Sequence, residues 1–138
     1  MVRVKFPHFT LEEAKVLEEF QKLFFKGAKW KYDVKLISRK AKLPESEPEP
    51  FKIMWRNLTA KRIDALVETE DAFHIIEVKR YMLPSGIGQL LVYAYMFNEQ
   101  FKPKKNVKLW YVTYYNDPDV EYICRQLGIE TWSLKRIV

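Results

Sequence analysis

Two runs of mainly apolar residues, KRIDALVE (61–68) and AFHIIEVKR (72–80), are separated by a short acidic turn. The alternation within each run predicts two strands, and the short connection predicts that they pair as an antiparallel hairpin. Asp64, Glu77 and Lys79 interrupt the apolar runs. A hairpin that only filled a core would carry valine or isoleucine at these positions, so the three charges need an explanation.

The two strands offer a simple geometry for these charges. Side chains alternate between the faces of a strand, so Glu77 and Lys79 project from one face, about 7 Å apart along the chain. By the same rule, Asp64 lies on the face opposite Ile63 and Ala65. If the strands pair with these faces aligned, Asp64 approaches Glu77 across the ladder.

Two carboxylates in a partly buried place repel each other, and one pKa rises unless a cation lies between them. A divalent metal is the simplest such cation, and oxygen ligands favour a hard ion such as Mg²⁺ or Mn²⁺. Lys79 could then orient or deprotonate a water, or stabilise the charge that develops on a phosphate. The alternative is an ion pair, Glu77 with Lys79 or Asp64 with Arg62, that only balances charge.

The segment after the hairpin makes the pattern more specific. In GQLLVYAY (88–95), Gln89 and Tyr93 are four residues apart and share one face of a helix. An aspartate on one strand, Glu-x-Lys on the next and Gln-x-x-x-Tyr on the following helix together resemble the PD-(D/E)XK nuclease superfamily. The Gln-x-x-x-Tyr spacing is similar to the motif that follows the active site in RecB-like nucleases of that superfamily.

This resemblance implies a role for each motif residue. Asp64 and Glu77 would bind the metal, and the backbone carbonyl of Val78 would be a further ligand. Lys79 would act on the nucleophilic water. Gln89 would hold Lys79, the water or a phosphate.

Substrate contacts are expected around the same motif. Tyr93 would support the substrate backbone or simply pack, and Arg62, Arg80 and Tyr81 are the other substrate-side candidates. Many members of the superfamily add a glutamate ligand from the first helix, and Glu13 is the best candidate here. Its preferred explanation is nevertheless a capping box with Thr10 at the start of that helix.

The chain departs from the superfamily pattern in several places. Ile63 precedes Asp64 where the family name has proline, but only the aspartate has chemistry to perform. Cys124 is the single cysteine, which excludes an internal disulfide and the four-cysteine cluster of some RecB-like nucleases. We expect His8 at the surface before the first helix, and His74 as a hydrogen-bonded histidine on the face away from the carboxylates.

The order of elements predicts an α/β fold with a mixed central sheet flanked by helices, the restriction-endonuclease-like core in the order αβββαβαβ. We expect one domain, 1–138, interrupted by a Pro/Glu-rich surface loop at about 43–50, with a short strand at 51–56 and a break at PSGIG (84–88). The other expected elements are a helix from Thr10 to before Gly27, strands at 32–38, 61–68, 72–80, 107–115 and 130–138, and helices at 89–101 and 118–127.

The charge is compatible with a polyanionic partner. Basic residues outnumber acidic ones by 24 to 18, giving a net charge of +6, and they gather at 26–42 and 102–108. Such surfaces suit nucleic acid, although a solvated lysine-rich surface explains them equally well. There is no long apolar run and no signal-peptide pattern at the N-terminus, so we expect an intracellular protein with no membrane partner.

Together these observations predict a magnesium-dependent DNA nuclease that hydrolyses phosphodiesters by direct attack of water. It would act on a DNA structure or end in repair, recombination or replication, and would need no small-molecule cofactor besides the metal. One alternative is a homodimeric Holliday junction resolvase. Alternatives of other classes are a DNA-binding module that has lost catalysis and a protein-interaction domain.

Overall fold

A computed structural model describes residues 8–137 as an α/β fold around a five-stranded mixed sheet in the order β1-β2-β3-β4-β5. The strand pairs β1/β2 and β2/β3 are antiparallel, and β3/β4 and β4/β5 are parallel. This confirms the expected fold class and the central hairpin. The elements are α2 (Leu11–Leu23), β1 (Lys29–Leu36), the 3-10 helix η1 (Arg39–Ala41), α3 (Glu49–Thr59), β2 (Lys61–Glu68), β3 (Ala72–Tyr81), α4 (Pro84–Phe101), β4 (Asn106–Tyr115), α5 (Pro118–Gln126) and β5 (Ile129–Lys135).

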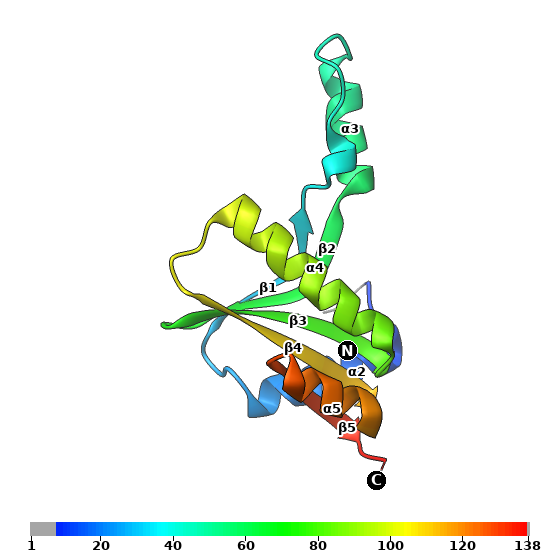
Figure 1. Ribbon diagram of the computed structural model, residues 1–138, viewed down its shortest axis with the longest axis vertical. Helices are drawn as coiled ribbons and strands as arrows, with labels where there is room; N and C mark the ends of the chain where they lie inside the picture. Colours follow the sequence, from blue (N-terminus) through cyan, green and yellow to red (C-terminus); the bar gives the residue numbers. More distant parts are fainter. Residues whose placement is uncertain (1–7, 138) are drawn as a thin grey trace.

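Helices cover both faces of the sheet, with α2 behind it and α4 and α5 in front in the view of Figure 1. Ile76 and Val78 pack beneath α2, whereas Ile75 packs beneath α4. Burying each such side chain contributes about 1.5–3 kcal/mol. The alternation along β3 is therefore as predicted, and Glu77 and Lys79 lie on the α4 side with Ile75.

The first helix begins where the sequence predicts. The Thr10 hydroxyl accepts from the Glu13 backbone N–H, and the Glu13 carboxylate accepts from the Thr10 N–H, both at 3.1 Å. The capping box is thereby confirmed. The helix buries Leu17 and Phe20 against the sheet.

The predicted strand at 51–56 is wrong, because these residues lie within α3. Phe51, Met54 and Leu58 recur at helical spacing, and Glu49 and Pro50 already belong to the helix, where proline is tolerated in the first turn. The predicted loop therefore ends at residue 48. The order αβββαβαβ also needs correction, since α3 separates the first two strands.

The predicted break at 84–88 is likewise wrong, because α4 begins at Pro84. Gly86 fits inside the helix because its Cα faces an aromatic ring: a Cβ there would lie 2.1 Å from Cζ of Tyr111. The Tyr111 hydroxyl also donates to the Leu83 carbonyl at 2.7 Å. These contacts hold the start of α4 tightly against β4.

The hairpin of β1 and β2 extends beyond the sheet. Pairing of β2 with β3 runs from Glu68 to Ala65, whereas pairing of β2 with β1 continues to Lys61. The free end of the hairpin carries η1 and α3, which project away from the sheet at the top of Figure 1. We call residues 35–62 the arm; its helix α3 has no buried residue.

The side chains of β2 stop alternating strictly between the two faces of the sheet where the strand leaves β3. Alternation predicts Ile63 on the side of Ala65, but Ile63 packs in the cluster beneath α4 while Ala65 packs beneath α2. Strict alternation fails here because it holds only along a regularly paired strand. Asp64 lies at this point, where β2 and β3 separate, which we call the fork of the sheet.

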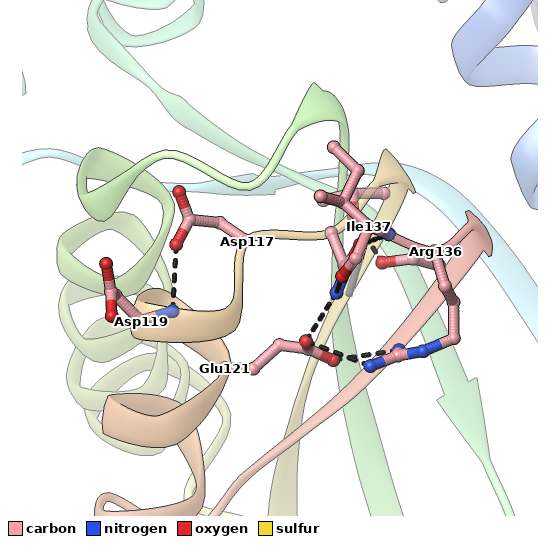
Figure 2. Close-up of polar contacts among 8 residues, drawn as sticks. Asp117, Asp119, Glu121, Arg136 and Ile137 are labelled. Carbon is pink, nitrogen blue, oxygen red and sulfur yellow. Dashed lines mark hydrogen bonds and ion pairs between the residues drawn. The ribbon is translucent and has the colours of Figure 1, made fainter.

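The C-terminal end is held by a buried glutamate on α5 (Figure 2). Glu121 accepts two hydrogen bonds from Arg136, at 2.9 and 3.1 Å, and one from the Asn116 amide at 2.6 Å. At the start of α5, the Asp117 carboxylate accepts from the Asp119 N–H at 2.9 Å. Both oxygens of Glu121 thus have partners.

Within residues 8–137, none of the helices combines the length and the apolar character needed to cross a bilayer. The prediction about a signal peptide depends partly on residues 1–7, which lie outside the described residues. Cys124 is a buried free thiol.

Candidate functional site

The structure brings Asp64 and Glu77 together at the fork between β2 and β3. Ala65 pairs with Ile76, so the next facing positions along the hairpin are Asp64 and Glu77. One oxygen of Asp64 accepts from the Val78 backbone N–H at 2.8 Å. A side chain thus replaces the backbone partner that Val78 loses where the strands separate.

Glu77 is the most unusual group of this site. Its residue is 2% exposed, and its Oε1 has no hydrogen-bond partner in the described part of the chain. Its Oε2 lies 3.5 Å from the Nζ of Lys79, whose side chain is 39% exposed. Leaving a buried polar atom without a partner costs about 1–3 kcal/mol, and more if it is charged.

Both carboxyl groups respond to this environment. Burial, the negative charge of Asp64 and a shared hydrogen bond with Asp64 raise the pKa of Glu77 to about 9, although Lys79 opposes the shift. Burial also raises the pKa of Asp64, against hydrogen bonds from Glu77 and the Val78 N–H. The pair therefore retains a proton at neutral pH, and a cation placed between the two groups would take over its role.

Helix α4 delivers Gln89 and Tyr93 to the same place. Burial and the charges of Glu77 and Asp64 raise the pKa of Tyr93 to about 12, while a hydrogen bond with Gln89 opposes this rise. Tyr93 therefore lies within electrostatic range of both carboxylates. Beside it is a surface concavity of about 400 Å³, lined by Lys61, Ser85, Gly88, Gln89, Val92 and Tyr93.

Glu13 lies on the other side of the fork and serves as a helix cap. Burial is the main cause of the raised pKa of Asp64, and the hydrogen bonds with Glu77 and Val78 and the charge of Lys79 oppose it. The negative charge of Glu13 is a further, smaller cause of the rise. Among residues 8–137, however, no three His, Cys, Asp or Glu side chains gather into a metal-binding group. The described carboxylate set is therefore Asp64 and Glu77.

The other substrate-side candidates are spread around the site. Arg80 pairs with Glu12 of α2 at 3.1 Å, on the face away from Lys79. The ring of Tyr81 stacks on Tyr115 with 5.6 Å between centroids, and it is about half exposed. Arg62 is exposed at the base of the arm.

The two histidines have local partners. His8 is exposed and lies 3.2 Å from the Asp33 carboxylate. His74 is buried and accepts from the Trp110 indole N–H at 3.1 Å, with the Thr69 hydroxyl 3.2 Å from its other nitrogen. Both placements agree with the sequence prediction.

Sequence reasoning missed the contact that positions α4 beside Glu77. Gly86 and Tyr111 meet because the glycine has no side chain, and this sets the distance of the first turn of α4 from the sheet. A glycine within an apolar helical pattern is the signal that could have indicated such an approach. Its partner on β4 could not be identified from spacing alone.

No protein-family model matches this chain, and comparison with curated proteins and with solved structures finds no match either. The resemblance to PD-(D/E)XK nucleases therefore depends on the motif residues of this chain and on their arrangement at the fork.

Proposed function

We propose that this protein is a DNA nuclease that uses Mg²⁺ or Mn²⁺ to hydrolyse phosphodiester bonds. The observation that carries the proposal is the unpartnered oxygen of Glu77, buried beside Asp64 and on the same face as Lys79. A plain ion pair between Glu77 and Lys79 would leave that oxygen unsatisfied and the pKa of Glu77 still raised. A divalent cation satisfies both.

The donor set fits a hard cation. Mg²⁺ is commonly held by one or two carboxylates and keeps several waters or substrate phosphate oxygens as its other ligands. Asp64 and Glu77 would supply the carboxylates, and the carbonyl of Val78 is the further candidate ligand. When bound, the ion would activate a water and neutralise charge on the scissile phosphate.

The remaining groups have distinct tasks in this proposal. Lys79 is partly exposed, so its ammonium can contact an incoming water or phosphate while staying beside Glu77. It would stabilise the negative charge that grows on the phosphoryl oxygens during direct attack by water. Gln89, next to Tyr93 at the concavity, would orient Lys79, the water or a phosphate oxygen.

The cellular setting belongs to the same proposal. A nuclease of this kind would act inside the cell in DNA repair, recombination or replication. A basic chain with a net charge of +6 is suited to a polyanionic substrate, because each phosphate contact releases counterions.

The test is cleavage of a panel of labelled linear, nicked, flapped, single-stranded and four-way-junction DNAs with Mg²⁺ or Mn²⁺. We expect cleavage that EDTA stops and that Glu77→Ala or Lys79→Ala abolishes, with circular dichroism showing an intact fold. Glu130→Ala and Lys108→Ala change the same residue types at exposed positions and serve as matched controls. Undiminished cleavage by both site variants would overturn the assignment.

A further inference from the structure

The arm holds most of the net charge of the protein. Residues 35–62 contain eight basic and three acidic side chains, a net charge of +5, against +6 for the whole chain. The three acidic residues are Glu45 and Glu47, which precede α3, and Glu49, which is its first residue. The rest of the arm carries basic charge alone.

Much of this charge is not neutralised within the molecule. Lys40, Lys42, Arg56 and Arg62 are exposed, and none forms an ion pair with another described residue. Arg39, by contrast, pairs with Glu99 of α4 at 2.9 Å. The base of the arm is therefore a cationic surface available to a partner.

This surface is continuous with the candidate active site. Arg62 is two residues from Asp64 on β2, at the point where the hairpin leaves the sheet. Lys61 lines the concavity that Gln89 and Tyr93 also line. A polyanion that reaches Lys79 would thus pass the base of the arm.

Helix α3 adds a different surface to the arm. Phe51, Met54 and Leu58 are 39%, 48% and 70% exposed, and they recur on one face of the helix. The Trp55 indole holds the helix to η1 by donating to the Lys40 carbonyl at 2.6 Å. A helix of this length is marginal in water, so an exposed apolar face indicates that a partner covers it.

We propose that the arm binds the DNA next to the scissile phosphate. The basic side chains where the arm joins the sheet would contact phosphates, and the apolar face of α3 would contact unstacked nucleobases. DNA exposes apolar base faces at branches, frayed ends and single strands, and side chains bind these faces by stacking and wedging. This inference rests on the proposed nuclease function and names its substrate class: forked or branched DNA in preference to continuous duplex.

Charge favours DNA over a second copy of the chain as the occupant of the arm. Two arms brought together would each carry a net charge of +5, and like charges oppose association. A phosphate backbone complements the same charge. Self-association through α3 is therefore an outcome that the test must distinguish.

The test is fluorescence anisotropy of the full chain in EDTA, so that binding is measured without cleavage. The ligands are a blunt duplex, a Y-shaped fork of the same arms, and one single strand, each over a range of salt concentrations. Lys40→Glu with Lys42→Glu alters the arm, Met54→Ser with Leu58→Ser alters the face of α3, and Lys104→Glu with Lys108→Glu is a control of equal charge change elsewhere. Circular dichroism and sedimentation accompany every variant.

Wild-type protein should bind the fork more tightly than the duplex. The Lys40/Lys42 variant should bind every ligand about tenfold more weakly at low salt, with a salt slope smaller by about 2. The Met54/Leu58 variant should lose the preference for the fork, and the control should keep it. If the Lys40/Lys42 and the Lys104/Lys108 variants lose equal DNA affinity, the proposal is overturned. It is also overturned if the Met54/Leu58 variant loses self-association but keeps the preference for forked DNA.

The outcome also separates this inference from the nuclease proposal. Fork-selective binding through the arm without cleavage in Mg²⁺ or Mn²⁺ would support the arm as a binding surface and overturn the nuclease. Cleavage that depends on Glu77, with binding indifferent to the arm, would support the nuclease and overturn the arm.

Discussion

Two buried glutamates in this protein have opposite surroundings. Glu121 is 4% exposed and receives hydrogen bonds from Asn116 and, twice, from Arg136. Glu77 is 2% exposed, has Lys79 at 3.5 Å, and leaves one oxygen without a partner. The first group is paired with amide and guanidinium donors through both oxygens, whereas the second shares a hydrogen bond with the acidic Asp64 and keeps one oxygen, Oε1, without a partner among the described residues.

The pKa values follow the same division. Burial raises the pKa of Glu121, but the hydrogen bonds and charge of Arg136 and the bond from Asn116 outweigh it and leave the pKa lowered. Burial and Asp64 raise the pKa of Glu77 to about 9. A buried carboxyl group that the fold satisfies stabilises the fold, whereas one left unsatisfied is a candidate for binding a ligand.

The largest expected effect is on catalysis. Glu77→Gln keeps the shape of the side chain and removes its charge, so it should lower metal-dependent DNA cleavage by about 10³-fold, equivalent to several kcal/mol of lost transition-state stabilisation. Glu121→Gln is the matched change at the other glutamate and should retain near wild-type turnover. Initial rates on the best substrate of the DNA panel measure both, and equal losses would remove the distinction between the sites.

A second change tests the packing that holds α4 beside Glu77. Gly86→Ala places a methyl group 2.1 Å from the Tyr111 ring, so α4 or the ring must shift, and overpacking of this kind costs about 1–3 kcal/mol. Urea unfolding should show this loss, and cleavage should fall because Gln89 moves with the helix. Gly88→Ala, in the same helix with open space around its Cα, is the control for unfolding: it should not lose stability, and should gain about 0.5–1 kcal/mol because alanine favours a helix more than glycine does.

The hairpin and the facing of Glu77 and Lys79 were predictable because alternation along a strand is a local property of the chain. The helix α3 was not, since a short apolar run such as residues 51–56 fits a strand or a helix equally well until its contacts are known. Gly86 was misread as a break because its compatibility with a helix depends on a ring from β4.

The contrast between the two glutamates also could not be predicted from the sequence. Asn116, Glu121 and Arg136 meet only because β4, α5 and β5 fold together, and their spacing matches no motif. The unpartnered oxygen of Glu77 is likewise a property of the folded state. Sequence could indicate which residues have suitable chemistry, whereas the fold decides which of them lack partners.

A smaller effect is expected on stability. Glu121→Gln should lower the free energy of unfolding by about 1–2 kcal/mol at neutral pH, because it weakens charge-assisted hydrogen bonds to a partly exposed arginine. Glu77→Gln should raise it in EDTA, because the wild-type carboxyl, with its raised pKa, must take up a proton on folding at neutral pH and glutamine need not. A Glu77→Gln variant less stable than Glu121→Gln would contradict this explanation.

The pH dependence of stability should also differ between the two glutamates. Because the pKa of Glu121 is lowered on folding, its contribution to stability is present above the unfolded pKa and is lost as the pH falls through the folded value. The raised pKa of Glu77 has the reverse effect: its contribution is lost as the pH rises from near 4.5 towards about 9. Thermal unfolding in EDTA at pH 4, 6 and 8 measures both effects. The wild-type protein should lose stability relative to Glu77→Gln at pH 8, and should lose stability relative to Glu121→Gln at pH 4.

The central claim is that the unsatisfied carboxylates are a cation site, and metal-induced thermal stabilisation tests it most directly. The melting temperatures of wild type, Glu77→Gln and Glu121→Gln are compared at pH 7.5 in EDTA and in millimolar Mg²⁺ or Mn²⁺. An ion that binds the folded state alone raises the melting temperature, so wild type and Glu121→Gln should gain stability and Glu77→Gln should not. An equal gain in Glu77→Gln, or no gain in wild type, would contradict the account.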